Sequence, residues 1–189
     1  MAAGAGAAES TVALREVSVK AVFLYNFVRF VQWPEQVEEA DRPVVIGVFG
    51  KDPFGATLDA AVAGEEVFGR PLVVKRIARL EEAERCDEVF IAGSAAPQLR
   101  KILAFLEGKP VLTVSDIPGF AAQGGMIGLV SRGGRTKIQI NPDEAKAAGL
   151  QISSKLLRPA EIVSTRKKSN SLPIFRVRVA SAGGDAGGR

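Results

Sequence analysis

Histidine is absent from this chain of 189 residues, and cysteine and tryptophan each occur once. Without histidine, the Ser-His-Asp and Cys-His catalytic arrangements, imidazole metal sites and the usual neutral-pH general base are all excluded. The single cysteine, Cys86, excludes an intrachain disulfide and leaves the redox compartment undecided. Carboxylate and lysine chemistry remain available, so these absences lower the expectation of an enzyme without removing it.

Long hydrophobic runs are also missing, although 47% of the residues are hydrophobic. Lys20 and Arg29 interrupt the most apolar stretch, which therefore falls short of the roughly 18 to 20 apolar residues that span a bilayer. The opening MAAGAGAAES has neither the basic nor the apolar region of a signal peptide. We therefore expect one globular domain and no transmembrane segment.

Positive charge is concentrated at the C-terminal end. From Ser164 onward six basic residues accompany one acid, a net charge of +5 that leaves −1 for the rest of the chain. Such a segment can bind nucleic acid, anionic lipid or an acidic partner, but a solvated flexible end is the simpler interpretation, and we predict no nucleic-acid binding. The chain is expected to divide into a lead-in (1–17), a domain (18–163) and a basic, flexible tail (164–189).

The stretch 19–34, VKAVFLYNFVRFVQWP, is the most distinctive of the chain. At helical spacing its apolar residues form two adjacent stripes, which predicts a helix buried on nearly all sides. The first stripe contains Val17, Ala21, Leu24, Val28 and Val31, and the second contains Val19, Phe23, Phe27 and Phe30. Trp33-Pro34 is expected to end the helix. If the domain does not cover both stripes, the aromatic side chains become a candidate protein interface, formed by Phe23, Phe27, Phe30 and Trp33.

Apolar runs typical of strands alternate with helical patterns along the middle of the chain. Strands are expected at 44–50, 71–77, 88–92 and 111–114. Helices are expected at 53–64 and at 97–107, the latter closed by Gly108, and a charged connector or short helix at 80–85. This alternation predicts a single α/β domain whose mostly parallel sheet is flanked by helices.

The pattern changes toward the C-terminal end. Two strands at 126–131 and 137–141, joined through Gly133-Gly134, predict an antiparallel hairpin. Asn141 is expected to cap a helix that begins at Pro142. A final helix is expected over 152–162. The alternation over 172–179 predicts either an edge strand or a segment that pairs with a partner.

Three of the expected parallel strands end in small or acidic residues. Ligands of open α/β sheets gather beyond the carboxyl ends of the strands, so these residues are candidates for a small-ligand site. They are Gly50, Asp52, Gly93, Ser94, Ser115 and Asp116. The same residue types are also what short strand-to-helix loops require, which is the purely structural alternative.

The other motifs do not indicate catalysis. Gly124-Gly125 is followed by an expected strand and by no Lys-Ser/Thr pair, so it does not fit a phosphate-binding loop. Asp52, Asp116, Asp143 and Glu144 are scattered and suit loops or first helical turns. We predict no metal, no cofactor and no enzymatic activity.

Several stretches together resemble the YfiR/HmsC-like family. The resemblance covers 18–162 in order and is most specific in the helix that ends in Trp-Pro, in the segment from TVSD to GGMI, and in the Asn-to-SSKLL ending. The matching stretches are VKAVFLYNFVRFVQWP, IGVFGKDPFG, GRPLVVKRI, CDEVFIAGS, VLTVSDIPGFAAQGGMIGLV, IQIN and AGLQISSKLLRPA.

The resemblance implies a non-enzymatic periplasmic regulator. It would bind the periplasmic sensing domain of a membrane-bound diguanylate cyclase and inhibit it, lowering cyclic-di-GMP and biofilm formation, and it would form a homodimer. The resemblance also implies redox control through cysteine pairs. Cys86 alone cannot provide such a pair within one chain, so only an intermolecular bond remains. The alternative is a periplasmic small-ligand sensor module that feeds a signalling kinase or cyclase.

Overall fold

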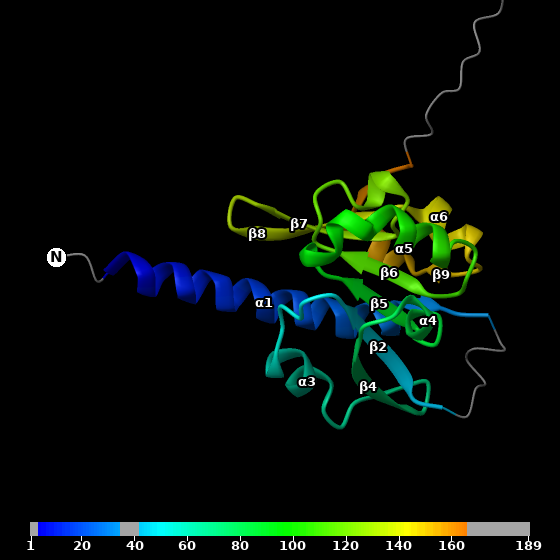
Figure 1. Cartoon of the computed structure of the whole chain (residues 1–189), viewed down its shortest axis with the longest axis horizontal. Helices are drawn as coiled ribbons and strands as arrows, with labels where there is room; N and C mark the ends of the chain where they lie inside the picture. The colour runs from blue at the N-terminus through cyan, green and yellow to red at the C-terminus, as the bar shows by residue number, and fades with distance from the viewer. Residues whose placement is uncertain (1–3, 35–41, 166–189) are drawn as a thin grey trace, which may run out of the picture.

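The computed structural model describes residues 4–34 and 42–165 (Figure 1). A long N-terminal helix is followed by strands and shorter helices in alternation. The helices are α1 (Gly4–Phe30), α3 (Ala56–Val62), α4 (Leu80–Ala83), α5 (Leu99–Leu106), α6 (Pro142–Ala147) and α7 (Ser154–Leu157), with 3-10 turns η1 (Gly93–Gln98) and η2 (Ala121–Gln123). The strands are β1 (Val31–Gln32), β2 (Val44–Phe49), β3 (Glu66–Val67), β4 (Arg70–Ile77), β5 (Glu88–Ile91), β6 (Leu112–Ser115), β7 (Ile127–Arg132), β8 (Arg135–Ile140), β9 (Gln151–Ile152) and β10 (Glu161–Ile162).

Eight strands form one sheet in the order β10-β8-β7-β6-β5-β2-β4-β3. The strands β4, β2, β5, β6 and β7 are all parallel to one another, whereas β8 is antiparallel to β7. Taken in chain order, the parallel strands follow the doubly wound arrangement 2-1-3-4-5, whose direction of winding reverses between β2 and β5. The predicted α/β fold with a mostly parallel sheet and a late antiparallel hairpin is confirmed.

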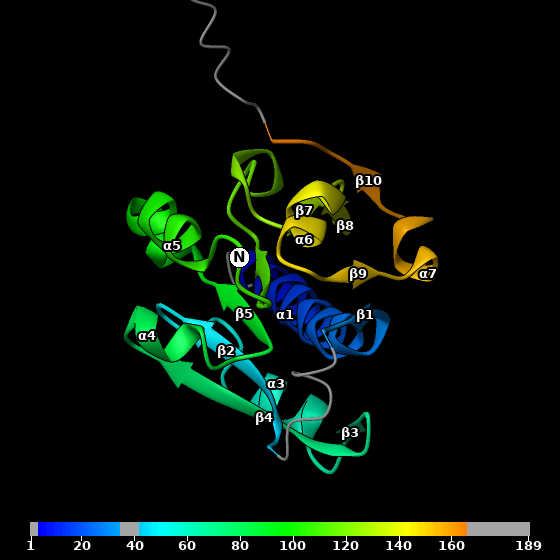
Figure 2. The ribbon, with the colours of Figure 1, turned by 90° about the vertical axis from the view of Figure 1, so that its right-hand side faces the viewer.

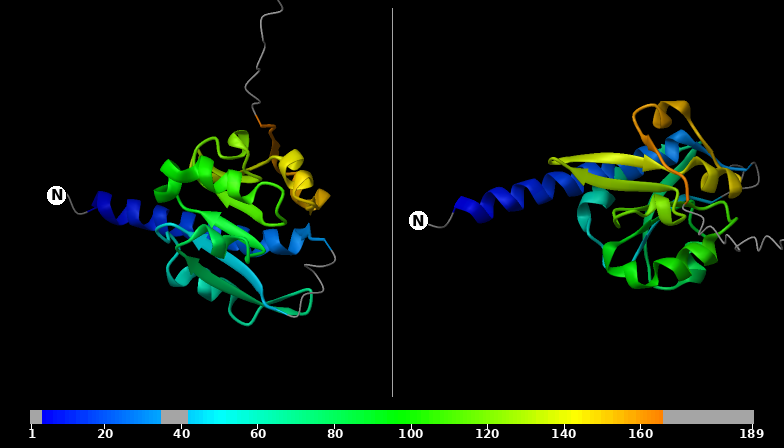
Figure 3. Two further views of the ribbon diagram at one scale, coloured as in Figure 1. Left: turned by 45° about the vertical axis from the view of Figure 1, so that its right-hand side comes forward. Right: turned by 90° about the horizontal axis from the view of Figure 1, so that it is seen from above.

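Helix α1 covers one face of the sheet, and α4 and α5 cover the other (Figure 2). The expected first stripe of α1 packs on the sheet: Ala21, Leu24, Val28 and Val31 are buried, together with core residues of β2, β5, β6, β7 and β8. The N-terminal half of α1 continues beyond the body of the domain (Figures 1 and 3). Helix α1 therefore combines a buried anchor with a projecting segment.

The ends of the domain differ from the prediction in two places. Helix α1 begins within the expected lead-in, at Gly4, and ends at Phe30, because Val31 and Gln32 pair with β9. The expected helix over 152–162 is wrong: a single turn, α7, is flanked by β9 and β10. Short backbone pairings with β1 and with β8 take up these residues, so tertiary hydrogen bonding overrides the local helical pattern.

Two local predictions are confirmed in detail. Gly133 and Gly134 both have positive φ, 59° and 71°, and join β7 to β8 in a tight turn. The Asn141 side chain accepts a hydrogen bond from the backbone N–H of Glu144 and caps α6. The expected strand over 172–179 lies outside the described residues.

The ring of Phe120 lies against the backbone of Gly125 and leaves no room for a side chain there. A Cβ atom at this position would stand 2.1 to 2.4 Å from the ring of Phe120, which is itself 1% exposed. We expect Gly125→Ala to lower the free energy of unfolding by about 2 kcal/mol, since a packed core absorbs an added methyl poorly. Urea denaturation measures this, with Gly93→Ala as the control because a Cβ there meets nothing within 4 Å. Equal stability of the two variants would contradict the prediction.

Candidate functional site

The six predicted ligand-loop residues gather at one edge of the sheet, because β2, β5 and β6 are neighbours with parallel direction. Gly50 and Ser94 flank the reversal point between β2 and β5, and a Cβ on Gly50 would stand 2.8 Å from Ser94 Oγ. Lys51 donates its backbone N–H to that same Oγ at 2.8 Å. The structure thus brings these loops into contact.

Their polar side chains are engaged in contacts within the chain. Ser115 is fully buried, donates to the carbonyl of Ile91 at 2.6 Å and accepts from the N–H of Ile117 at 3.0 Å. Asp52 accepts from the backbone of Phe54 at 2.7 Å and pairs with Arg76 at 2.9 Å. These contacts fix the loops, so a ligand at this edge would compete with existing hydrogen bonds; the ligand site stays a prediction.

Asp116 is held by the long helix. Lys20 Nζ lies 2.7 Å from Asp116 Oδ2 and 2.8 Å from Glu16 Oε1. Burial lowers the pKa of Lys20, but its hydrogen bonds to both carboxylates outweigh burial and leave the pKa above its ordinary value. Lys20 therefore stays charged and ties α1 to the loop after β6.

The predicted aromatic interface needs correction. Phe27 and Trp33 are 0% and 6% exposed and belong to the core, so they offer no surface to a partner. Phe23 and Phe30 are half-buried against that core, and the Phe23 ring stacks on Phe27 with centroids 5.9 Å apart. The second stripe is therefore largely covered by the chain itself.

Exposed apolar side chains lie instead on the outer side and projecting part of α1. Val12, Leu14, Val19 and Val22 are 57%, 66%, 42% and 51% exposed. At 100° per residue, Val12, Val19 and Val22 share the side of the helix that points away from the sheet. The sequence contained this signal, but the expected helix began too late to include Val12 and Leu14. We call Val12, Val19 and Val22 the outer α1 patch; Leu14 lies on another side of the helix and is exposed because this part of α1 projects.

Glu88 is a buried acid that the sequence analysis did not single out. It is 0% exposed, and neither carboxylate oxygen has a hydrogen-bond partner among the residues that the structure describes. Its register neighbours are Ile46 on β2 and Leu112 on β6, both core residues below α1. Burial, reinforced by the charge of Asp87, raises the pKa of Glu88 well above its ordinary value and so favours the protonated carboxyl.

Asp87, the residue before Glu88, is also buried, but its carboxylate is hydrogen-bonded. Asp87 is 1% exposed but receives two hydrogen bonds from Arg42, at 2.7 and 2.9 Å, and one from the N–H of Val45 at 2.8 Å. Asp87 is therefore part of a structural ion pair that fixes the entry into β2 against β5.

Cys86 is buried and faces Gly47, where a Cβ would stand 2.7 Å from its Sγ. Burial raises the pKa of the thiol to about 11. This position favours a packing role over the intermolecular disulfide that sequence reasoning left open.

We expect Cys86 of the native chain to react with Ellman's reagent at pH 7.5 about a hundredfold more slowly than in urea, because thiolate is scarce at this pKa. The reaction is followed by absorbance. A Cys86→Ser, Ser131→Cys double variant, with its thiol on the exposed hairpin, serves as the fast-reacting control. A fast native reaction would show that Cys86 is available for an intermolecular bond.

No group of three or more metal-ligating side chains is found within residues 4–34 and 42–165. In the same ranges no helix has the length and apolar character needed to cross a membrane. The described residues thus show a set of loops at the carboxyl edge, an exposed apolar helix patch and a buried acid without a hydrogen-bond partner.

Strand order and site features define a single-domain α/β protein of the doubly wound kind, in which a long helix projects from the sheet. The chain belongs to the YfiR/HmsC-like family, whose model matches residues 17–161. The resemblance inferred from the sequence is thereby confirmed. The family is one of periplasmic regulators rather than catalysts, and membership suggests a role in diguanylate cyclase signalling.

Comparison with curated proteins found no match. Among solved structures, a conserved domain protein from Vibrio cholerae is 14% identical, with a TM-score of 0.46 over 62% of this chain and 54% of that one. The ABC domain from Streptococcus pneumonia, in complex with L-Trp, is 13% identical, with a TM-score of 0.46 over 64% and 55%. CD0873, a substrate binding protein from Clostridium difficile, is 16% identical, with a TM-score of 0.43 over 65% and 55%. The chain thus spans about half the length of the solved chains that it matches.

Proposed function

We propose that this protein binds the periplasmic sensing domain of a membrane-bound diguanylate cyclase and holds the cyclase inactive, which lowers cyclic-di-GMP and biofilm formation. Family membership supports the class of partner. The observation that carries the proposal on this chain is the outer α1 patch, an apolar surface that the domain leaves uncovered. Apolar patches presented on a rigid element are typical protein-binding surfaces.

The helix is well suited to present this patch. Its C-terminal half is anchored in the core through Leu24, Phe27 and Val28, each 0% exposed, and Lys20 ties its middle to Asp116. The projecting half is therefore held in a fixed direction, so that a partner can be bound without first ordering the helix.

We expect Val22→Asp to relieve inhibition, so that cellular cyclic-di-GMP rises to the level of a gene deletion while the melting temperature of the purified protein stays within about 2 °C of the wild type. Val22 is 51% exposed, and a charge there costs the fold little but opposes an apolar contact. Cyclic-di-GMP is measured by mass spectrometry of cell extracts.

The control is Ile162→Asp, which places the same charge on a 54% exposed apolar residue of β10. Inhibition should survive in that variant. If deletion of the gene itself leaves cyclic-di-GMP unchanged, the regulatory proposal is wrong; if only Val22→Asp is silent, the partner binds another face.

We also propose that the protein forms a homodimer in which the outer α1 patches of two chains pair. Sedimentation velocity of the wild type and of Val22→Asp tests it: a dimer that becomes a monomer in the variant supports pairing through the outer α1 patch. A wild type that sediments as a monomer at all concentrations contradicts the dimer.

A small-ligand sensor is the second candidate function. The observation in its favour is that Gly50 and Ser94 flank the reversal point of the sheet, where ligands of doubly wound folds bind. A thermal-shift screen with nucleotides and amino acids tests this idea. Absence of any stabilising compound would weaken it.

A further inference from the structure

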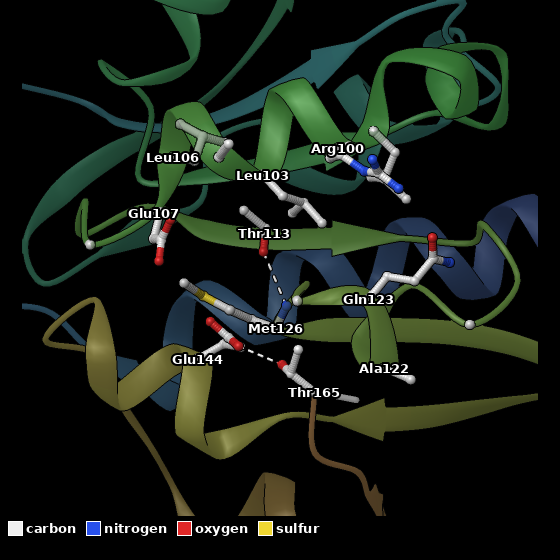
Figure 4. A pocket seen from close by; sticks show the side chains of 15 residues that line it. Arg100, Leu103, Leu106, Glu107, Thr113, Ala122, Gln123, Met126, Glu144 and Thr165 are labelled. Atoms are coloured by element: carbon white, nitrogen blue, oxygen red, sulfur yellow. Dashed lines mark hydrogen bonds between the residues drawn. The ribbon is translucent and has the colours of Figure 1, made fainter. Parts of the chain in front are cut away.

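A groove of about 790 Å³ lies on the face of the domain opposite α1, between α5, the η2 turn and the start of α6 (Figure 4). Its walls are mainly apolar, and among the residues that line it are Leu99, Leu103, Leu106, Ala122 and Met126. Thr113 also lines the groove, but its Oγ1 accepts a hydrogen bond from the N–H of Met126 at 3.1 Å. The groove is therefore shaped to receive apolar side chains.

The last described residue is part of this groove. Thr165 lines it, accepts a hydrogen bond from Asn141 Nδ2 at 2.9 Å and donates one to Glu144 (Figure 4). Val163, two residues earlier, donates its N–H to the carbonyl of Ile140 at 2.8 Å. These bonds hold the chain at the wall of the groove at the point where the basic tail begins.

The tail contains a segment whose chemistry complements the groove. The sequence of residues 172–179, LPIFRVRV, combines the apolar residues Leu172, Ile174, Phe175, Val177 and Val179 with Arg176 and Arg178. The groove includes Glu107 and Glu144 among its lining residues, against the single basic residue Arg100. Mainly apolar walls with two acids among the lining residues match an apolar segment that carries arginines.

The chain that follows Thr165 is long enough for residues 172–179 to reach the groove. Only six residues separate Thr165 from Leu172, and they span at most about 25 Å when extended. Helix α5, which forms one wall, has eight residues and a length of about 12 Å, so that about four extended residues match it.

We propose that residues 172–179 fold back and occupy this groove, so that the tail is a docked segment of the domain that covers α5 and Met126. The inference is independent of the regulatory function, because it concerns a face of the domain opposite the outer α1 patch.

Hydrogen–deuterium exchange of the full chain tests the proposal. We expect amides of 172–179 to exchange at least about tenfold more slowly than a random coil. Leu103→Glu, which puts a charge into the half-buried groove wall, should abolish that protection, whereas Lys101→Glu, on an exposed position of the same helix, should not. Random-coil exchange of 172–179 in the wild type overturns the proposal.

A photocrosslinking residue in place of Phe175 tests directly whether the tail occupies the groove, without relying on a change in the stability of the domain. We expect crosslinks within one chain to peptides that contain Leu103 or Met126, and none from the same residue in place of Ala186. Phe175→Asp, which changes only the tail, should expose α5 to exchange. Crosslinks that join two chains would show that the segment binds a second copy, and this too overturns the proposal.

Discussion

Replacing Phe27 by aspartate unfolds the protein. The Phe27 ring is fully buried, stacks on Phe23 and belongs to the cluster that joins α1 to the sheet. Truncating a buried phenylalanine costs about 3 to 5 kcal/mol, and a buried charge adds a further penalty. The expected loss of at least about 5 kcal/mol reaches the total stability of many domains.

Circular dichroism and urea titration measure this effect, and Val22→Asp is the matched control. Val22 lies five residues earlier on the same helix and is 51% exposed, so the same charge should leave the fold intact. A folded Phe27→Asp variant that only changes its oligomeric state would show that Phe27 is an interface residue after all.

Replacing Glu88 by leucine stabilises the protein at neutral pH by about 3 kcal/mol. The native carboxyl is buried without a hydrogen-bond partner among the described residues and lies beside core residues of two neighbouring strands. Leucine of similar size removes the cost of burying a polar group, about 1 to 3 kcal/mol, and adds apolar burial. Thermal and urea denaturation at pH 7.5 measure the gain.

The same residue predicts a dependence of stability on pH. Because burial raises the pKa of Glu88 in the folded state, the folded chain keeps a proton that the unfolded chain releases above about pH 4.5. The contribution of Glu88 to stability is therefore fully present below that pH and is lost as pH rises toward the folded pKa. Glu88→Gln cannot titrate, so the wild type should lose stability relative to this variant as the pH rises from about 4.5 toward the raised folded-state pKa of Glu88. Parallel pH profiles would show that Glu88 titrates normally.

Much of the fold could be predicted from local patterns. The runs at 44–50 and 88–92 are short, apolar and rich in β-branched or aromatic residues, and both are buried strands. The pair Gly133-Gly134 suits a turn with two positive φ angles, and Asn141 before Pro142 suits a helix start. In these places the local preference and the final structure agree.

The candidate sites were harder to predict because they depend on what covers each side chain. The second α1 stripe contains Phe27, which is fully buried, and Val19, which is 42% exposed, although both are hydrophobic. Glu88 stands in an ordinary strand pattern, and its apolar surroundings are visible only once Ile46 and Leu112 are seen beside it. The groove at α5 joins segments that lie far apart in the chain.

The sequence by itself determined the family, the alternation of strands and helices, and the most apolar helix, since these depend on the spacing of residues along one segment. Only the tertiary structure decided that this helix extends past the sheet, that Phe27 and Trp33 belong to the core, and that the outer α1 patch remains exposed. The physical reason is that burial is a property of neighbours: apolar side chains of α1 that face the sheet lose water, whereas those on its outer side or on its projecting part keep it.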